Sequence, residues 1–366
     1  MKLSVIILNY NVRYFLELCL KSVERAISNL DGEIIVVDNN STDGSCEMVK
    51  SLFPKVILIE NKENCGFAKG NNIGVNKAKG EYLCILNPDT VVSEDTFEKI
   101  IEFYDVKPNA GIVGCHLIDG TGSFLPESKR NIPTPTVALK KMLGCSKSYY
   151  ANHINENEIG IADIFVGAFM FLKTSIYRET GGFDEDYFMY GEDIDLSYRI
   201  KKAGYQNYYF GETSVIHFKG ESTLKDTIYA KRFFGAMQIF YKKHFKRNLV
   251  FDTIVGIGIN LSKHLKFSKV EKPIYINNIF VYSDKTEGGF KGINNRKVHI
   301  LENLEAELTP NAMLIYDCDY ISFTSIIYDI RKRRLQKNLV FRFLLKGSNF
   351  IIGSDSSVRR GAVDKI

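Results

Sequence analysis

The residues that could do chemistry lie in polar loops that directly follow short apolar runs. Four loops of this kind are Asn9–Asn11, Asp38–Asp43, Asn61–Gly70 and Asn87–Asp89. Asn, Asp and Gly are common in loops because they turn the chain and cap helices, so each loop alone could be purely structural. Four such loops along one edge of a sheet would form a crevice lined with hydrogen-bonding groups. A crevice of this kind suits the binding of a nucleotide.

A second candidate set is acidic and lies in Tyr190-Gly-Glu-Asp-Ile-Asp195. Its three carboxylates begin a helical pattern over residues 194–203, and acids in a first turn stabilise a helix whether or not they react. One of them could also accept a proton from a hydroxyl group. Consecutive helix positions diverge by about 100°, so Asp195 should point away from Asp193.

The elements that must position these loops alternate along the first part of the chain. The pattern predicts strands over 3–8, 33–37, 56–60 and 82–86, separated by helices over 13–29, 44–53 and 69–78. The strands are apolar on both faces, which is typical of a parallel sheet covered by helices. Ligands bind beyond the carboxyl ends of the strands in such sheets, and the four polar loops lie there.

Composition narrows the class of protein. The chain has 366 residues, 45% of them hydrophobic and 12% aromatic, which is enough for about two globular domains. The net charge of +5 does not argue for a nucleic-acid binder. Seven cysteines without a CxxC pair indicate a reducing, cytoplasmic location. The apolar run at 1–8 is too short for a signal peptide, and no run reaches the roughly 18 residues that a spanning helix needs, so we expect a chain that does not cross a membrane.

Six stretches between residues 3 and 245, about two thirds of the chain, together resemble glycosyltransferase family 2 in its rhamnosyltransferase-like branch of bacterial polysaccharide biosynthesis. They are SVIILNYN, IIVVDNNSTDGS, NKENCGFAKGNNIG, YLCILNPDT, VGAFMFLKTSIYRETGGFDEDYFMYGEDIDLSYRIKKAGY and VIHFKGEST. The resemblance implies a GT-A fold, an α/β architecture with a Rossmann-like, mostly parallel sheet flanked by helices. The catalytic domain would span 1–228, with a nucleotide-binding half over about 1–110 and an acceptor half over about 111–228.

The resemblance also implies a site for a divalent cation, Mg²⁺ or Mn²⁺, on the diphosphate of the donor. Asp89 matches the last acid of the family's metal-binding motif, and Asn87 replaces its first acid, so metal binding should depend largely on the nucleotide. His217 matches a position that supplies a further ligand in some relatives. A lone His after an apolar strand is more often structural.

The remaining site residues follow from the same motifs. Asp193 is implied as the catalytic base, with Glu192 as its orienting partner or as an alternative base. The donor-binding residues implied by the resemblance are Asn9, Tyr10, Asp38, Asn64, Gly66, Phe67, Asn71 and Asn87. Asp38 would meet the nucleoside, and the Gly-rich loop would bring backbone amides to a phosphate or sugar. Phe67 could equally be a core anchor of that loop.

The implied activity is inverting, metal-dependent transfer of a sugar such as rhamnose. The donor would be a nucleotide-sugar, and the acceptor a hydroxyl of a glycan or of a polyprenyl-diphosphate-linked glycan, in cell-surface polysaccharide assembly. An alternative is a nucleotide-sugar-binding or nucleotidyl-transferring module without glycosyl transfer. Nucleotidyltransferases usually open with a Gly-rich, basic loop after the first strand, whereas this chain has NYNVRYF there, and the Glu192-Asp193 pair would have no role. An inactive homologue should have lost its acids, which are present.

Three further regions are less informative. In the loop over 124–136, Lys129 and Arg130 could contact phosphate, although solvated loop charges are the more common case. The basic, aromatic segment 229–272 could lie on an anionic membrane surface, making the protein peripheral at the inner face of the membrane, or could pack on the catalytic domain. Asp317-Cys-Asp319 spells a second DXD, but its context predicts a turn and a helix cap.

Residues 273–366 should form a small α/β accessory domain of unknown role. The pattern predicts strands over 274–282, 312–316, 339–345 and 350–352 and a helix over 323–334 with a basic carboxyl end. A nucleotide site, a docking surface and a simple scaffold are all open for it.

Overall fold

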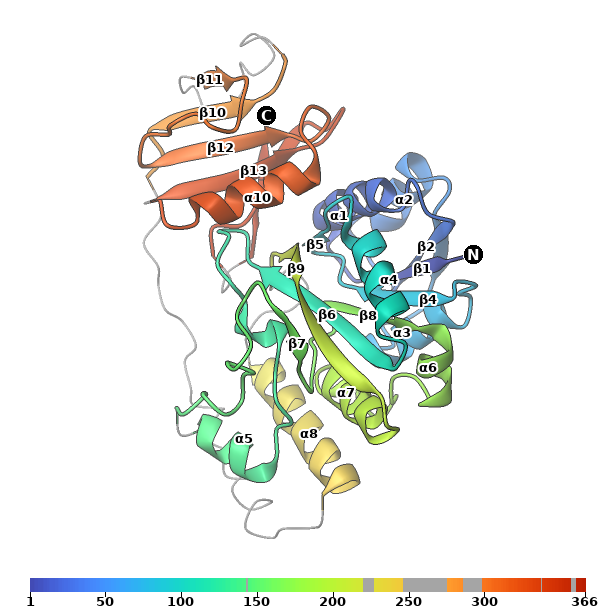
Figure 1. The fold of residues 1–366 in the computed structure, drawn as a ribbon. Coiled ribbons are helices and arrows are strands. Elements are labelled where there is room, and N and C mark those ends of the chain that lie inside the picture. The colour runs from blue at the N-terminus through green and yellow to red at the C-terminus, as the bar shows by residue number, and fades with distance from the viewer. Residues whose placement is uncertain (143, 220–226, 246–274, 286–297, 337, 357–359) are drawn as a thin grey trace.

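Two sheets form the frame of the protein (Figure 1). The structure, a computed structural model, describes residues 1–142, 144–219, 227–245, 275–285, 298–336, 338–356 and 360–366. Within these residues the first sheet has nine strands and the second has six.

The first strand, β1, is central to the parallel half of the large sheet. The strands of this half run in the order β3-β2-β1-β4, all parallel, and are joined by helices: β1 (Leu3–Asn9), α1 (Arg13–Ala26), β2 (Gly32–Asp38), α2 (Ser45–Leu52), β3 (Ile57–Glu60), α3 (Phe67–Val75) and β4 (Tyr82–Leu86). The register pairs Asn9 with Asp38, so the polar residues that end these strands meet at one edge. The predicted alternation and the parallel sheet are therefore confirmed.

The other half of the large sheet is mixed. It continues from β4 through β8, β6, β9 and β5, with β7 paired to β9; only the β6–β9 pair is parallel. The elements here are β5 (Thr90–Val91), α4 (Thr96–Val106), β6 (Ala110–Ile118), η1 (Pro126–Ser128), α5 (Pro135–Met142), β7 (Ile159–Ile161), β8 (Phe169–Lys173), α6 (Thr174–Glu179), α7 (Glu192–Lys202), β9 (Gln206–His217) and α8 (Thr227–His244).

Two apolar clusters cover the two faces of this sheet. One face packs against α1, α2 and α4 through residues such as Leu16, Met48 and Phe97. The opposite face packs against α3, α6 and α7 through Ala68 and Leu196, among others. The strands between these layers are buried on both sides, which is why they read as continuous apolar runs. A sheet fixed by two helical layers holds its carboxyl edge rigidly.

The C-terminal residues form their own sheet in the order β11-β10-β12-β13-β14-β15, of which the first four strands are parallel. Its elements are β10 (Asn278–Tyr282), β11 (Val298–Leu301), β12 (Ala312–Asp317), α10 (Phe323–Arg333), β13 (Leu339–Leu344), β14 (Phe350–Gly353) and β15 (Ala362–Lys365). The four predicted strands and the helix are present, and the short strands β11 and β15 were not predicted. We refer to residues 275–366 as the accessory unit.

The accessory unit shares an apolar cluster with the catalytic part. Phe15 and Leu18 of α1 and Phe218 after β9 pack with β10, β12, β13 and α10. The ring of Phe218 lies 4.9 Å from that of Phe15 and 5.9 Å from that of Phe343, between centroids. In Figure 1 the accessory unit (orange to red) accordingly lies against α1 and the end of β9.

The second DXD is a turn, as predicted, but Asp319 does not cap the helix. Asp317 is buried and accepts from Ser283 Oγ and Lys285 Nζ. The N-cap of α10 is Ser322, whose side chain accepts from the N–H of Ser325. A residue from the catalytic part adds to this cap: Glu94 accepts from the N–H groups of Phe323 and Thr324. The sequence could not show this long-range cap.

Candidate active site

The ends of β1 and β2 form the first part of the site. Asn9 donates from Nδ2 to Asp38 Oδ2 at 2.7 Å, and the other oxygen of Asp38 accepts from the N–H of Ser41 at 2.7 Å. Both Asn9 and Asp38 are buried, whereas Tyr10 lies exposed at the rim. The oxygen Oδ1 of Asn9 is buried without a hydrogen-bond partner among the described residues, so it can accept from a ligand.

The Gly-rich loop is fixed against both halves of the protein. Asn64 accepts from the N–H of Gly66, and Asn39 donates to the carbonyl of Gly66. Gly66 has φ 84°, and a Cβ there would lie 2.4 Å from the carbonyl oxygen of Phe188. Only glycine fits a backbone of this shape at this distance. The N–H of Phe67 donates to the same carbonyl at 2.7 Å, which ties the loop to the segment before α7.

Phe67 and Asn71 occupy the first turns of α3. The ring of Phe67 packs edge-on against that of Phe183, and a Cβ at Gly167 would lie 3.0 Å from its Cζ. These contacts favour the anchor role for Phe67. Asn71 donates to the carbonyl of Phe67, and its Oδ1 is buried without a partner among the described residues.

The third part of the site is the loop after β4 with the end of β9. The antiparallel pairing of β5 with β9 places Thr90 beside His217, and Phe218 donates its N–H to the carbonyl of Asp89 at 3.0 Å. Nε2 of His217 lies 3.5 Å from Asp89 Oδ1 and 3.4 Å from Asn87 Nδ2. Asn87, Asp89 and His217, which the sequence analysis connected with the metal, therefore lie together.

The donor atoms of this cluster fit a divalent cation. Oδ1 of Asp89 is buried, has no hydrogen-bond partner among the described residues and faces Nε2 of His217 at 3.5 Å. Carboxylate oxygen and neutral imidazole nitrogen both bind divalent metals. Across the part of the chain that the structure describes, no three His, Cys, Asp or Glu side chains gather as a metal site. A cation here would therefore need ligands from a bound nucleotide, in line with the loss of the first acid at Asn87.

The first turn of α7 holds Asp193 in a defined orientation. Oδ2 accepts from Arg130 Nη2 at 2.7 Å and from the N–H of Gly167 at 3.3 Å, and Oδ1 accepts from the N–H of Ile194 at 2.8 Å. Although burial opposes the charged guanidinium, Asp193 and Tyr149 raise the pKa of Arg130 above its usual value. A carboxylate has about four acceptor positions, so Oδ1 retains capacity for a further hydrogen bond.

Glu192 has different surroundings. It is buried, and its Oε2 has no hydrogen-bond partner among the described residues. Burial and the neighbouring Asp193 raise the pKa of Glu192 well above its usual value. These surroundings favour a protonated Glu192 beside a charge-paired Asp193, because two carboxylates that share a site do not both ionise easily.

Asp195 points away from this pair, as predicted. It is fully buried and accepts from Arg199 Nε at 2.6 Å, and its Oδ1 lies 2.5 Å from His244 Nε2 in α8. Although burial acts in the opposite direction, His244 and Arg199 lower the pKa of Asp195 below its usual value. Its role in this arrangement is to hold α8 and α7 together.

Two consecutive residues before β8 connect the first turn of α7, which carries Asp193, to the Asn87–Asp89 loop. Gly167 donates to Asp193, and the carbonyl of Ala168 accepts from the N–H of Asn87 at 3.0 Å. Asp193 and the Asn87–Asp89 loop are therefore held by two consecutive residues of the chain. The sequence did not identify Gly167 or Ala168, although VGAF was part of a recognised motif.

The expectation that Lys129 and Arg130 are solvated loop charges was wrong. Both residues are buried, with 4% and 7% of their surface exposed, and neither is a solvated loop charge. Lys129 donates to the carbonyls of Ala151 and Ile154, while Arg130 donates to Asp193 and to the carbonyl of Phe165. Both cations thus bind protein groups and are not displayed for phosphate. The sequence offered one clue to these two residues, a basic pair next to the prolines of the same loop.

The described part of the 229–272 segment packs on the catalytic domain. The helix α8 buries Ala236, Phe240 and Tyr241 against Ala138 and Tyr187. Tyr241 also donates its hydroxyl to the carbonyl of Pro133 at 2.5 Å. Residues 246–272 lie outside the described residues. No helix in the described ranges is long and apolar enough to cross a membrane.

The chain is similar to known glycosyltransferases. Residues 4–179 match the family model of glycosyl transferase family 2. The chain is 26% identical over 246 residues, 61% of this chain and 78% of the other, to N-acetylglucosaminyl-diphospho-decaprenol L-rhamnosyltransferase of Mycobacterium tuberculosis. It is 30% identical over 161 residues, 42% of this chain and 61% of the other, to rhamnosyltransferase WbbL of Escherichia coli. A mannosyltransferase of Pyrobaculum calidifontis, solved with GDP-Man and Mn²⁺, superposes with a TM-score of 0.48 at 21% identity, over 71% of this chain and 69% of that one.

Proposed function

Because residues 4–179 belong to glycosyl transferase family 2, the chain is a glycosyltransferase similar to rhamnosyltransferases of polysaccharide biosynthesis, and we propose its reaction in more detail. It transfers a sugar, with rhamnose as the first candidate, from a nucleotide-sugar to a hydroxyl of a glycan acceptor. Transfer inverts the anomeric carbon in a single displacement and requires Mg²⁺ or Mn²⁺.

The observation that carries this proposal is the link between the two acidic loops through Gly167 and Ala168. A transferase needs its leaving-group side and its base on opposite sides of one sugar. Gly167 and Ala168, consecutive in the chain, hold Asp193 and Asn87 and would keep these two sides at a fixed separation. Fixed positioning of reacting groups is a large part of the rate that enzymes provide.

The donor would lie along the carboxyl edge of the parallel strands. We infer that Asp38 and Asn9, which are hydrogen-bonded to each other, would contact the nucleoside, and that the loop over Asn64–Asn71 would contact the diphosphate or the sugar. A divalent cation held by Asp89 and His217 would neutralise charge on the departing diphosphate when it is bound. Asn87 would add a neutral contact beside it.

Asp193 is proposed as the base. Arg130 and Gly167 orient its Oδ2, so its Oδ1 can accept the hydrogen of the attacking hydroxyl. Glu192, with a raised pKa, is proposed as a neutral neighbour that shapes the turn. No protein group forms a covalent bond to the sugar in this reaction.

The acceptor is proposed to be lipid-linked, since the Mycobacterium tuberculosis relative is named for a diphospho-decaprenol acceptor. The protein would then work in the cytoplasm, peripheral to the inner face of the cell membrane. Lys242, in the last turn of α8, would suit an anionic surface, whereas Lys243 of the same turn is paired with Asp184 and Asp186.

A screen of nucleotide-sugars tests this proposal without any acceptor. Each nucleotide-sugar is added with Mg²⁺, with Mn²⁺ or with a chelator, and both its hydrolysis and the thermal stabilisation of the protein are measured. One donor should be hydrolysed slowly and should raise the melting temperature only with the metal. Metal-dependent binding without hydrolysis, and without transfer to any glycan, would support a binding module instead. Release of nucleoside monophosphate would indicate nucleotidyl transfer.

A further inference from the structure

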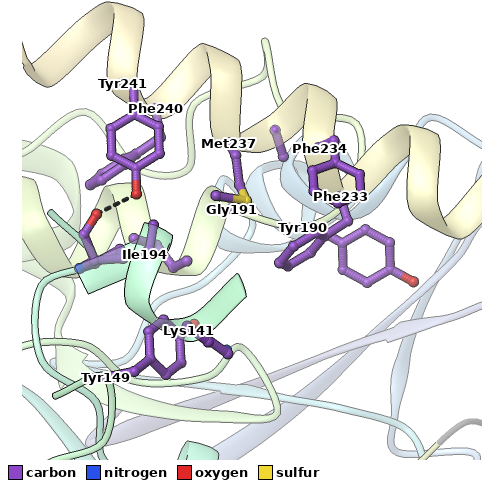
Figure 2. A pocket seen from close by; sticks show the side chains of 13 residues that line it. Lys141, Tyr149, Tyr190, Gly191, Ile194, Phe233, Phe234, Met237, Phe240 and Tyr241 are labelled. Carbon is purple, nitrogen blue, oxygen red and sulfur yellow. Dashed lines mark hydrogen bonds between the residues drawn. The ribbon is translucent and has the colours of Figure 1, made fainter. Parts of the chain in front are cut away.

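An apolar cavity lies directly beside the catalytic turn (Figure 2). Its volume is about 230 Å³. One wall is α8, which contributes Phe234, Met237 and Phe240, and the floor includes Gly191 and Ile194 at the start of α7. Its lining is almost entirely carbon, so the cavity is suited to a hydrocarbon group and not to a sugar.

The floor of the cavity is continuous with the base. Gly191 and Ile194 flank Glu192 and Asp193 in the chain, and the N–H of Ile194 donates to Asp193 Oδ1. Gly191 has φ 85°, and a Cβ there would lie 3.1 Å from that of Ala236 in α8. The turn that carries the base is therefore pressed against the helix that forms the cavity wall. A molecule in the cavity would therefore contact Gly191 and Ile194, the chain neighbours of Glu192 and Asp193.

The cavity also has one cation. Among the described residues that line it, Lys141 of α5 is the only charged side chain, and its Nζ lies 3.2 Å from the centre of the Tyr149 ring. Burial lowers the pKa of Lys141, although Tyr149 acts to raise it. A single ammonium at the edge of an apolar cavity complements a molecule with one hydrocarbon end and one anionic group.

We propose that this cavity binds the first part of the acceptor's hydrocarbon chain, and that Lys141 contacts the phosphate that joins the chain to the sugar. The inference rests on the proposed function, because it names a subsite for a lipid-linked acceptor. An apolar cavity of about 150 Å³ binds benzene, so one of this size holds roughly nine carbon atoms. Two isoprenoid units match that size. Met237, with its flexible thioether, can adapt to such a chain.

A binding test needs neither donor nor transfer. The chain has no tryptophan, so Phe234→Trp places a single indole in the cavity wall. Titration with geranyl phosphate should change its emission saturably, and inorganic phosphate should not. Gln238→Trp, on the exposed side of the same helix, is the matched control and should not respond. No response of Phe234→Trp, or an equal response of both variants, would overturn the proposal.

The role of Lys141 is tested in the same assay. Adding Lys141→Met to Phe234→Trp should weaken geranyl phosphate by at least tenfold and leave the binding of geraniol within about twofold. Equal weakening of both compounds would contradict a contact with phosphate. Saturable binding of inorganic phosphate as tight as that of geranyl phosphate would contradict the role of the cavity, since the anion would then need no chain.

A transfer assay connects the cavity to catalysis. The same acceptor sugar is offered on geranyl diphosphate and on a methyl group, and the ratio of the two KM values is measured. Met237→Trp, which fills the cavity, should reduce the preference for the geranyl acceptor at least tenfold, while Gln238→Trp should keep it. An unchanged preference in Met237→Trp would contradict the cavity. If the wild type transfers to neither acceptor and Phe234→Trp still binds geranyl phosphate, the proposed function is wrong, and the cavity binds an isoprenyl phosphate that is not an acceptor.

Discussion

Nη2 of Arg130 lies 2.7 Å from Oδ2 of Asp193, in an ion pair whose side chains are 8% and 11% exposed. Removing one partner of a buried pair leaves an uncompensated charge and typically costs about 3–5 kcal/mol of unfolding free energy. Arg130→Met should therefore destabilise the protein by an amount in this range, measured by urea denaturation. Combining it with Asp193→Asn should recover part of the loss, because both charges are then absent. Strictly additive effects of the two substitutions would mean that the pair is not coupled.

Asp193→Asn should separate binding from chemistry. The loss of a general base typically lowers turnover by about 100-fold to 10,000-fold, and the amide keeps the shape of the side chain. Donor affinity, measured by calorimetry with the metal, should stay within about twofold. Glu192→Gln should reduce turnover less, because the amide resembles a protonated Glu192. A larger loss for Glu192→Gln than for Asp193→Asn would exchange the two assignments.

Asp195→Asn should act on stability. Asp195 is paired with Arg199 and His244 and points away from the base, so its loss weakens one contact between α8 and α7 while the reacting groups keep their own hydrogen bonds. We expect a loss of about 3 kcal/mol in unfolding free energy and, for the folded fraction, near-normal turnover. The check is the turnover of Asp195→Asn divided by the fraction of protein that binds nucleotide. That fraction is measured by titration with a tight-binding nucleotide.

The raised pKa of Glu192 predicts a pH effect on stability. In the folded state Glu192 keeps its proton above the ordinary value of 4.5, whereas the unfolded chain releases it there. Because the folded state then binds more protons, the unfolding free energy should fall as pH rises from about 4.5 towards the folded pKa. Glu192→Gln should remove this contribution. The difference between wild type and variant, followed by urea denaturation from pH 5 to 8, should therefore grow in favour of the variant; a constant difference would contradict a raised pKa.

Asp89→Ala should abolish transfer and metal-dependent donor binding while the protein stays folded. Oδ1 of Asp89 is buried without a hydrogen-bond partner among the described residues, and its described ion-pair contact is with His217, the other proposed ligand. Asp105→Ala, an exposed acid at the end of α4, is the matched control. Thermal shifts with the donor and Mn²⁺ should vanish in the first variant and persist in the second. Full turnover of Asp89→Ala at saturating metal would remove this residue from the site.

Glu94→Ala should weaken the junction with the accessory unit. Its carboxylate accepts from Phe323 and Thr324 at 2.8 and 2.7 Å, and the loss of a helix cap costs about 1 kcal/mol. Glu102→Ala, on the exposed side of α4, should change stability by less than about 0.5 kcal/mol. Equal unfolding midpoints for the two variants would show that the cap contributes nothing measurable.

The sequence predicted the parallel half of the sheet well because burial on both faces leaves continuous apolar runs. The strand over Tyr82–Leu86 was predicted to the residue, since all five side chains are buried. The edge strand β15 alternates between half-buried and exposed positions, and such a short segment carries little signal. The pattern of apolar residues was therefore enough to predict strands that are buried on both faces, and it was not enough to predict the edge strand β15.

The sequence analysis named the acids of the candidate site, but it did not identify the residues that hold them. Asp89, Asp193 and Asp38 stand in recognisable motifs, whereas Arg130 stands in a loop with prolines and charges, a composition typical of exposed chain. Its burial depends on Asp193, 63 residues away. The two possible fates of the aromatic residues in α8 were also indistinguishable, because lipid and a protein core select the same side chains.

The placement of Phe218 has a consequence for attempts to build chimaeras of this enzyme. This residue follows His217 directly, and its ring is held between α1 and the accessory sheet. If the accessory unit is replaced by that of a relative, the new unit would therefore meet a foreign surface next to His217, a candidate metal ligand. Residues of α1 that face the accessory unit and Phe218 after β9 would have to be exchanged together with it. A recombination point chosen only from the position of the linker would separate these contacting residues.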